Sequence, residues 1–334
     1  MKLTRSTLLL ICPLLMMGCN NKFKSIPSLK PEKTKSEFQD STYFSSTWNI
    51  QRYNGAFFIT DSRNERVLEL DASLDLMQSF GRAGRGPGEF NFIGSIVAHA
   101  DSLYVYDGGG MRFHVYSLEG DYIRSFPVPY PLNDARVVLL KDRLYMASTY
   151  ASGDSSSIFI TDLQGKVIKH FEKNPSANPR INLTNRLLFS SADEDEIIAV
   201  STSEPFVERY SADGEFLGFF DLRRIEALKY LWDLYEENKS RNTRRHETVL
   251  FTDAYMDEAF LYINCAGWPG RDNYTYLVKL EVAERSIKLV SVFKIQGAED
   301  YPALFQTIFV DGDTLIATDI STDAIYTFDL SGLN

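Results

Sequence analysis

The 334-residue chain is poor in the residue types from which local metal sites and disulfide frameworks are built. Of its three cysteines, Cys12 lies in an N-terminal apolar run and Cys265 has no partner, which argues against a structure that depends on disulfides. The longest N-terminal apolar run, Leu8–Met17, is too short to span a bilayer as a helix. The four histidines are scattered without the H-x-x-x-H or H-E-x-x-H spacing of a local metal site; they are His99, His114, His170 and His246.

Positive charge is also in deficit. The chain has 35 lysine and arginine residues against 45 aspartate and glutamate residues, for a net charge of −10. Cleavage of residues 1–18 would remove two basic residues and no acidic ones, which takes the mature chain to −12. Such an acidic chain is unsuited to binding nucleic acid or an anionic membrane surface, so nucleic acid is excluded as a predicted partner.

The first residues have the pattern of a secretory signal peptide, with two basic residues ahead of Leu8–Met17 and a Gly18-Cys19 end. The end of this segment, Leu15–Cys19, resembles a bacterial lipobox. That resemblance implies cleavage after Gly18 and a lipid on Cys19, whereas ordinary secretory cleavage near Gly18 is the alternative. Residues 19–35 hold five lysines, two prolines and several serines, which predicts a flexible tether.

What the chain has in quantity is β-prone sequence, with 13% aromatic residues. A strand, a polar turn and a second strand recur six times, at intervals of 46, 45, 49, 70 and 48 residues. A further strand precedes most of these units, which makes about four strands in each ~45-residue unit, the size of a propeller blade. The residues that lead the six turns are Asp71, Ser117, Asp162, Ser211, Glu281 and Asp329.

The 70-residue interval contains a helical pattern within residues 221–245. Without these 25 residues the interval is 45, so the pattern predicts a helical insertion between blades 4 and 5. Its apolar stripe predicts packing against a sheet edge rather than a ligand box. The stripe consists of Ile225, Leu228, Trp232 and Tyr235, and the polar residues away from it are Glu226, Lys229, Asp233 and Glu236.

The sixth unit lacks an outer strand, because only Ser331–Asn334 follow its last strand. The segment Ser36–Ser45 precedes the first unit with β-prone residues to spare, and we expect it to complete the last blade and close the ring. Residues 36–334 are therefore predicted to form one all-β domain, a six-bladed β-propeller.

The first unit resembles the NHL repeat, whose pattern is an apolar strand, Asp, Asn, Arg, two further strands and a glycine-rich tail that ends in Phe. The second unit keeps Asp107 and Arg112, and the last keeps Asp319. The whole chain looks like the six-bladed propeller lipoproteins of Bacteroidetes, whose roles are largely unassigned. The matching residues of the first unit are Asp61, Asn64, Arg66, Gly81, Gly84, Gly86, Gly88 and Phe90.

The aspartates of the repeat are predicted to be structural. Asp61, Asp107 and Asp319 each end a strand just before a turn, where a carboxylate can accept backbone N–H bonds. Arg66 and Arg112 are expected to bridge neighbouring blades.

Two loops are the candidate ligand sites. The loop Gly81–Gly88 carries Arg82 and Arg85, and we expect it near the channel mouth, where the arginines could hold a carboxylate, a phosphate or a sugar acid. A repeat linker with solvated arginines is the alternative. Trp268 and Arg271 lie in a second loop that could stack on a sugar ring or a peptide aromatic, with an ordinary long hairpin as the alternative.

The leading functional hypothesis is a monomeric binding or scaffolding module for a peptide, a glycan or a partner protein, with no cofactor. The lipobox implies that it meets the membrane only through its anchor. The residues after Cys19 lack the acidic cluster typical of surface export, which favours an outer-membrane location facing the periplasm. The competing hypothesis is a propeller enzyme, a lyase or hydrolase, with a metal held on the ring axis by residues from several blades. A purely structural role in the envelope is the third.

Overall fold

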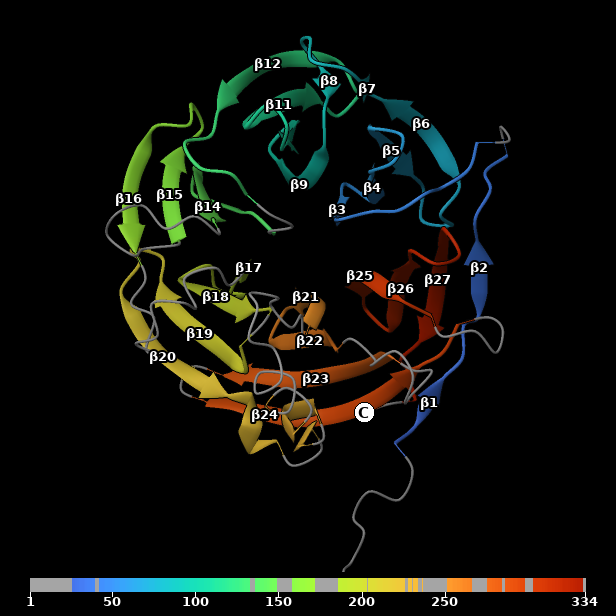
Figure 1. The fold of residues 1–334 in the computed structure, drawn as a ribbon, viewed down its shortest axis with the longest axis vertical. Helices are drawn as coiled ribbons and strands as arrows, with labels where there is room; N and C mark the ends of the chain where they lie inside the picture. Colours follow the sequence, from blue (N-terminus) through green and yellow to red (C-terminus); the bar gives the residue numbers. More distant parts are fainter. Residues whose placement is uncertain are drawn as a thin grey trace, which may run out of the picture.

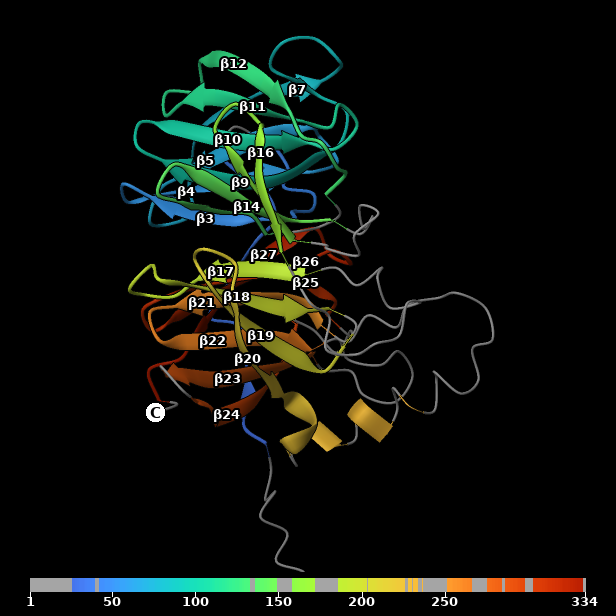
Figure 2. The same cartoon turned by 90° about the vertical axis from the view of Figure 1, so that its left-hand side faces the viewer.

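The structure is a computed structural model that describes residues 26–39, 42–132, 136–148, 158–171, 186–202, 204–225, 228–229, 231–233, 236, 251–265, 275–283, 286–297 and 303–332. Six antiparallel sheets stand around a common axis, each with its first strand innermost (Figure 1). Figure 2 shows the same blades edge-on, with their strands running across the thickness of the ring. The predicted six-bladed β-propeller is confirmed.

The first three blades each contain four antiparallel strands, numbered from the axis outward. Blade 1 consists of β3 (Ile50–Tyr53), β4 (Ala56–Asp61), β5 (Arg66–Leu70) and β6 (Leu76–Phe80). Blade 2 consists of β9 (Ile93–His99), β10 (Ser102–Asp107), β11 (Arg112–Ser117) and β12 (Tyr122–Pro127). Blade 3 consists of β13 (Val138–Leu140), β14 (Arg143–Ala147), β15 (Ile158–Asp162) and β16 (Val167–Phe171).

The last three blades repeat this order, with additions at the outer edge. Blade 4 consists of β17 (Arg186–Ser190), β18 (Glu196–Ser201), β19 (Phe206–Ser211) and β20 (Phe216–Asp221). Blade 5 consists of β21 (Phe251–Asp257), β22 (Phe260–Cys265), β23 (Thr275–Ala283) and β24 (Ser286–Ile295). Blade 6 consists of β25 (Phe305–Asp311), β26 (Thr314–Asp319) and β27 (Ala324–Asp329), and its fourth strand comes from the N-terminus.

The hydrophobic core is divided among the six interfaces between blades. The middle strands bury apolar side chains on both faces, as in β4, where five of six residues are buried. Six separate clusters of buried apolar residues result, one for each pair of neighbouring blades, including the pair of blades 6 and 1 that closes the ring. No blade could bury both faces alone, so the ring is the unit that is stable.

The N-terminal segment closes the ring, but with other residues than predicted. The outer strand of blade 6 is β2 (Lys33–Lys35), which pairs antiparallel with β27. A further strand, β1 (Ser28–Leu29), pairs in parallel with β24 on the outer edge of blade 5. Both lie within residues 19–35, so the prediction of a tether that extends to Lys35 is wrong for its last part. Residues 36–39 and 42–45, where the outer strand was expected, instead lead toward blade 1.

The helical insertion packs as predicted where the structure describes it. A short 3-10 helix, η1 (Leu222–Arg224), follows β20, and residues 229, 231–233 and 236 are helical. Its apolar stripe, Ile225, Leu228 and Trp232, is buried in the core between blades 4 and 5, whereas Lys229 and Asp233 are exposed. Tyr235 and Glu226 lie outside the described residues.

A β-bulge recurs between the third and fourth strands of blades 1 to 5. In each blade the extra residue on the outer strand is a large aliphatic side chain that is at least 43% exposed. A bulge twists an outer strand and interrupts its regular edge, which disfavours pairing with another molecule. The five residues are Met77, Ile123, Ile168, Leu217 and Val290.

Candidate functional site

Polar side chains gather on the ring axis at one level of the inner strands. Asp253 and Thr307 pair with the fifth residue of the second strand in blades 5 and 6, where blade 4 has Leu187. In blades 1 to 3 a polar residue lies in the inner strand or within two residues before it. Each of these five polar residues is buried although it lies in, or just before, the strand nearest the channel. These residues and their exposed fractions are Asn49 (4%), Ser95 (5%), Arg136 (6%), Asp253 (3%) and Thr307 (1%).

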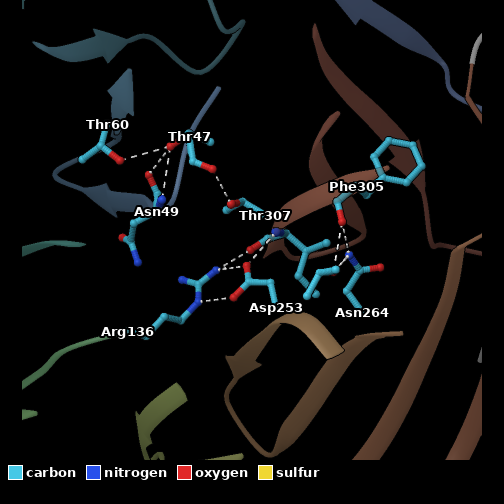
Figure 3. Close-up of polar contacts among 10 residues, drawn as sticks. Thr47, Asn49, Thr60, Arg136, Asp253, Asn264, Phe305 and Thr307 are labelled. Atoms are coloured by element: carbon cyan, nitrogen blue, oxygen red, sulfur yellow. Dashed lines mark hydrogen bonds and ion pairs between the residues drawn. The ribbon is translucent and has the colours of Figure 1, made fainter. Parts of the chain in front are cut away.

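An ion pair crosses the axis from blade 3 to blade 5 (Figure 3). Arg136, just before β13, donates from Nε to Asp253 Oδ1 at 2.8 Å and from Nη2 to Asp253 Oδ2 at 2.5 Å. The same Nη2 donates to the carbonyl of Ile308 in blade 6 at 2.7 Å, and the Ile308 N–H donates to Asp253 Oδ2 at 2.8 Å. Three blades are thus joined through one guanidinium.

Aromatic rings flank this guanidinium. Its Cζ lies 5.9 Å from the ring centre of Phe189 in blade 4 and 5.7 Å from that of Tyr255 in blade 5, within the range of cation–π attraction. The apolar surroundings weaken hydration, so burial raises the pKa of the Asp253 carboxyl, while Arg136 acts in the opposite direction. Burial likewise raises the pKa of the Tyr255 hydroxyl.

Neutral hydrogen bonds complete the axial network between blades 5, 6 and 1. Thr307 in blade 6 donates from Oγ1 to the carbonyl of Thr47 at 2.8 Å, which ties the last blade to the segment that enters blade 1. Asn264 in blade 5 donates from Nδ2 to the carbonyl of Phe305 in blade 6 at 2.7 Å. The described polar groups of this half of the axis therefore serve mainly to hold blades together.

A family model described as "6-bladed beta-propeller" (DUF5128) matches residues 31–211, more than half of the chain. The chain belongs to the DUF5128 family of six-bladed propellers. A search of the curated proteins gives no match.

Solved structures with the same architecture are similar to this DUF5128 propeller at low sequence identity. A Bacteroides fragilis protein described as a candidate exported protein has 13% identity and a TM-score of 0.57, with 91% of this chain and 99% of that chain covered. A member of the DUF4221 family from Bacteroides vulgatus has 10% identity and a TM-score of 0.55, with 90% and 97% covered. Virginiamycin B lyase from Staphylococcus aureus, in an inactive form with quinupristin, has 12% identity and a TM-score of 0.50, with 84% and 79% covered. Identities this low show a shared fold alone.

The glycine-rich loop of this DUF5128 propeller lies away from the channel mouth where it was expected. Its short strands β7 (Arg82–Ala83) and β8 (Glu89–Phe90) pair in parallel, and the loop contacts the third and fourth strands of blade 2. Arg82 is 79% exposed and donates from Nε and Nη2 to Glu89. The N–H of Gly86 and the Arg82 guanidinium hold the pKa of the Glu89 carboxyl below its usual value. Binding of an anion by Arg82 and Arg85 stays a prediction.

The other candidate loop, with Trp268 and Arg271, and the lipidation site Cys19 lie outside the described residues. Cys265 is buried at the end of β22, as predicted, and burial raises the pKa of its thiol, so it is suited to packing rather than to nucleophilic attack. No group of three or more His, Cys, Asp or Glu side chains arranged to hold a metal occurs in the ranges given above. The same ranges contain no helix both long and apolar enough to cross a membrane.

The repeat aspartates tie each blade to the segment that enters it. Asp107 accepts from the N–H of Asn91, just before blade 2, and Asp319 accepts from the N–H of Leu304, just before blade 6. Asp61 is bonded by Ser45 Oγ, just before blade 1, and by Asn64 Nδ2. Asp319 also accepts a backbone N–H bond of its own turn, from Ser321, as the sequence indicated, whereas the described bonds of Asp61 and Asp107 include none of this kind.

The two repeat arginines bind mainly within their own blades, so the prediction that they bridge neighbouring blades is wrong. Arg66 pairs with Asp61 at 2.8 Å, and Arg112 pairs with Asp107 at 3.1 Å. Their other described contacts are to carbonyls of incoming segments, from Arg66 to Tyr43 and from Arg112 to Arg85.

Replacement of Asp107 by Asn is expected to lower the free energy of unfolding at pH 7 by about 1–3 kcal/mol, because a charged acceptor of two described hydrogen bonds is lost. Burial opposes ionisation of Asp107, yet hydrogen bonds from neighbours that include Asn91 and Arg112 hold its pKa below the usual value. The contribution of ionised Asp107 to stability is therefore present above the ordinary pKa of about 3.9 and is lost as the pH falls through the lower folded-state value.

Urea unfolding from pH 7 to pH 2.5 should show that the difference in free energy of unfolding between the wild type and the Asn variant shrinks below pH 4. A deficit that is the same at every pH would contradict this account, and the exposed Asp101→Asn serves as control.

Proposed function

We propose that this DUF5128 propeller is a lipid-anchored, NHL-like binding or scaffolding module of the cell envelope. It acts in the periplasm, held to the outer membrane by its N-terminus, and binds a peptide, a glycan or a partner protein without catalysis. The observation that carries the binding role is the axial ion pair. Arg136 and Asp253 form an ion pair on the axis, and they neutralise one another there.

The path of the N-terminal segment supports the anchored arrangement. Ile26 packs against the core between blades 4 and 5, and the carbonyl of Pro27 accepts from the N–H of Lys294 in β24. A lipid on Cys19 would be seven residues from Ile26, a span of about 25 Å at full extension. The ring is then held close to the membrane by its rim at blade 5, which leaves its two faces open to partners.

The anchor is tested by replacing Cys19 with Ala. We expect the wild-type protein to sediment with membranes and the Cys19→Ala variant to move to the soluble fraction, because one thioether-linked lipid group supplies the whole attachment. Labelling with a radioactive fatty acid should mark the wild type and not the Cys19→Ala variant. Cys265→Ala is the matched control and should stay with the membranes. If the Cys19→Ala protein still sediments with membranes, the proposed lipid anchor at Cys19 is wrong.

The absence of catalysis is tested by metal analysis of the purified protein. We expect less than stoichiometric zinc, copper and calcium, because Asp253 is already bonded to Arg136 and to the Ile308 N–H. One metal ion per chain that is lost in an Asp253→Asn variant would favour the propeller enzyme instead.

A further inference from the structure

Three donors on the axis, from three consecutive blades, have no partner among the residues that the structure describes. Arg136 uses Nε and Nη2 for its described bonds and leaves Nη1 without one. Asn49 bonds through its backbone, and its side-chain amide makes no hydrogen bond with the described residues. Ser95 Oγ is buried without a partner. An unsatisfied polar group in a buried position is costly, so Ser95 Oγ calls for a hydrogen-bond partner, while the Asn49 amide and Arg136 Nη1 are donors that a ligand could engage.

The three groups lie at one level of neighbouring strands. Asn49 immediately precedes β3, Ser95 lies in β9 where its pairing with β10 is irregular, and Arg136 precedes β13 by two residues. The strands β3 and β9 are in contact, and so are β9 and β13. In Figure 3 the Asn49 side chain extends toward the Arg136 guanidinium, with no other drawn side chain between them. Neither the Asn49 amide nor Arg136 Nη1 is among the fully buried unpartnered atoms, so both keep contact with solvent.

We infer that blades 1 to 3 form an axial site for a carboxylate, with Asn49 Nδ2, Ser95 Oγ and Arg136 Nη1 as donors. This inference rests on the proposed binding role and names its ligand chemistry. Nη1 supplies two N–H groups, while Nε and Nη2 are held by Asp253 and by the Ile308 carbonyl, so the guanidinium cannot turn away. The rings of Phe189 and Tyr255 lie within cation–π range of the group and help to keep it in place.

Charge decides between a carboxylate and a phosphate. The guanidinium charge is already matched by Asp253, so a ligand adds its whole charge to a buried region. A singly charged carboxylate with three or four hydrogen bonds can be accommodated there, whereas a phosphate dianion would keep most of its desolvation cost. The site is therefore expected to discriminate against phosphate.

The test uses the full chain, purified in a mild detergent, and ligand-detected NMR titrations. Acetate is the minimal probe, and acetamide is its neutral isostere. We expect saturable binding of acetate, no binding of acetamide, and weaker binding of phosphate than of acetate. Asn49→Leu should weaken acetate binding at least about tenfold, since a hydrogen bond to a charged group is lost. Ser95→Ala is the second variant and should also weaken it. Gln51→Leu, on the same strand β3 but bonded to its neighbour's carbonyl, is the control and should bind as the wild type does.

Competition identifies the source of the carboxylate. Displacement of acetate by N-acetyl-dialanine, and not by its amide, would indicate a peptide C-terminus, whereas displacement by glucuronate would indicate an acidic glycan. Three results would each contradict the proposed carboxylate site. They are equal binding of acetate and acetamide, tighter binding of phosphate than of acetate, and unchanged acetate affinity in a folded Asn49→Leu protein. Those results leave membrane attachment and metal content untouched, so they are distinguishable from failure of the proposed function.

Discussion

Replacing Asp253 by Ala is expected to destabilise the propeller by about 3–5 kcal/mol, because it leaves the Arg136 guanidinium buried without its counter-ion. The same change removes the acceptor of the Ile308 N–H, which joins blade 5 to blade 6. Arg136→Ala should have an effect of similar size, since it leaves the carboxylate of Asp253 unpaired. Urea unfolding followed by far-UV circular dichroism gives the free energy of unfolding for each variant.

A double variant separates the cost of an unpaired charge from the loss of the pair itself. Arg136→Met with Asp253→Leu removes both charges and keeps apolar bulk, so we expect it to be more stable than either Ala variant. Lys229→Ala removes an exposed ion pair with Asp233 and should change stability by about 0.5 kcal/mol or less. If the two Ala effects simply added in an Arg136→Ala, Asp253→Ala double variant, the pair would not be coupled and the account would fail.

The architecture was predictable because each blade repeats one local pattern. Strands alternate with turns that contain residues such as Asp71 and Gly120, and the ~45-residue period sets the number of blades. The helical insertion was also visible, since its apolar residues recur with helical spacing around Leu228 and Trp232. These signals are local, so a single sequence contains them.

The axial site was not predictable in the same way. Arg136 and Asp253 are 117 residues apart, and neither belongs to a recognisable motif. Their meeting depends on the radial placement of blades 3 and 5, which no local pattern encodes. A usable signal exists once the strands are aligned, because a polar residue then recurs at one inner-strand position from Asn49 to Thr307. The glycine-rich loop led to the prediction that Arg82 binds a ligand near the channel mouth, yet in the structure Arg82 pairs with Glu89 away from the axis.

The two N-terminal strands were missed because they need little hydrophobic sequence. An outer strand is held by backbone hydrogen bonds and leaves its side chains in solvent, so the Lys33-Thr34-Lys35 sequence of β2 suits it. Such a segment has the composition of a tether, and composition alone cannot separate the two. What distinguishes it is Leu29, a buried side chain in the core between blades 5 and 6.

Removal of residues 1–35 is therefore expected to cause a large loss of stability, whereas removal of residues 1–25 should cause little. The longer truncation deletes β1 and β2 and withdraws Leu29 from its core, which by itself costs about 2 kcal/mol. The lost backbone bonds, such as that from the Glu32 N–H to the carbonyl of Thr327, add about 1 kcal/mol each. We expect a total of at least about 3 kcal/mol in urea unfolding.

The truncation also uncovers the outer edges of β27 and β24, which are free to pair with a second molecule. Blades 1 to 5 interrupt their outer edges with bulges, but β27 forms a regular ladder with β26 and shows no such interruption, so its edge is the more open to pairing. Size-exclusion chromatography should therefore show a concentration-dependent dimer for the protein that lacks residues 1–35 and a monomer for the one that lacks residues 1–25. Equal stability and equal size of the two truncated proteins would mean that the N-terminal strands contribute nothing to closing the ring. The ring would then be held by its axial contacts and inter-blade cores alone.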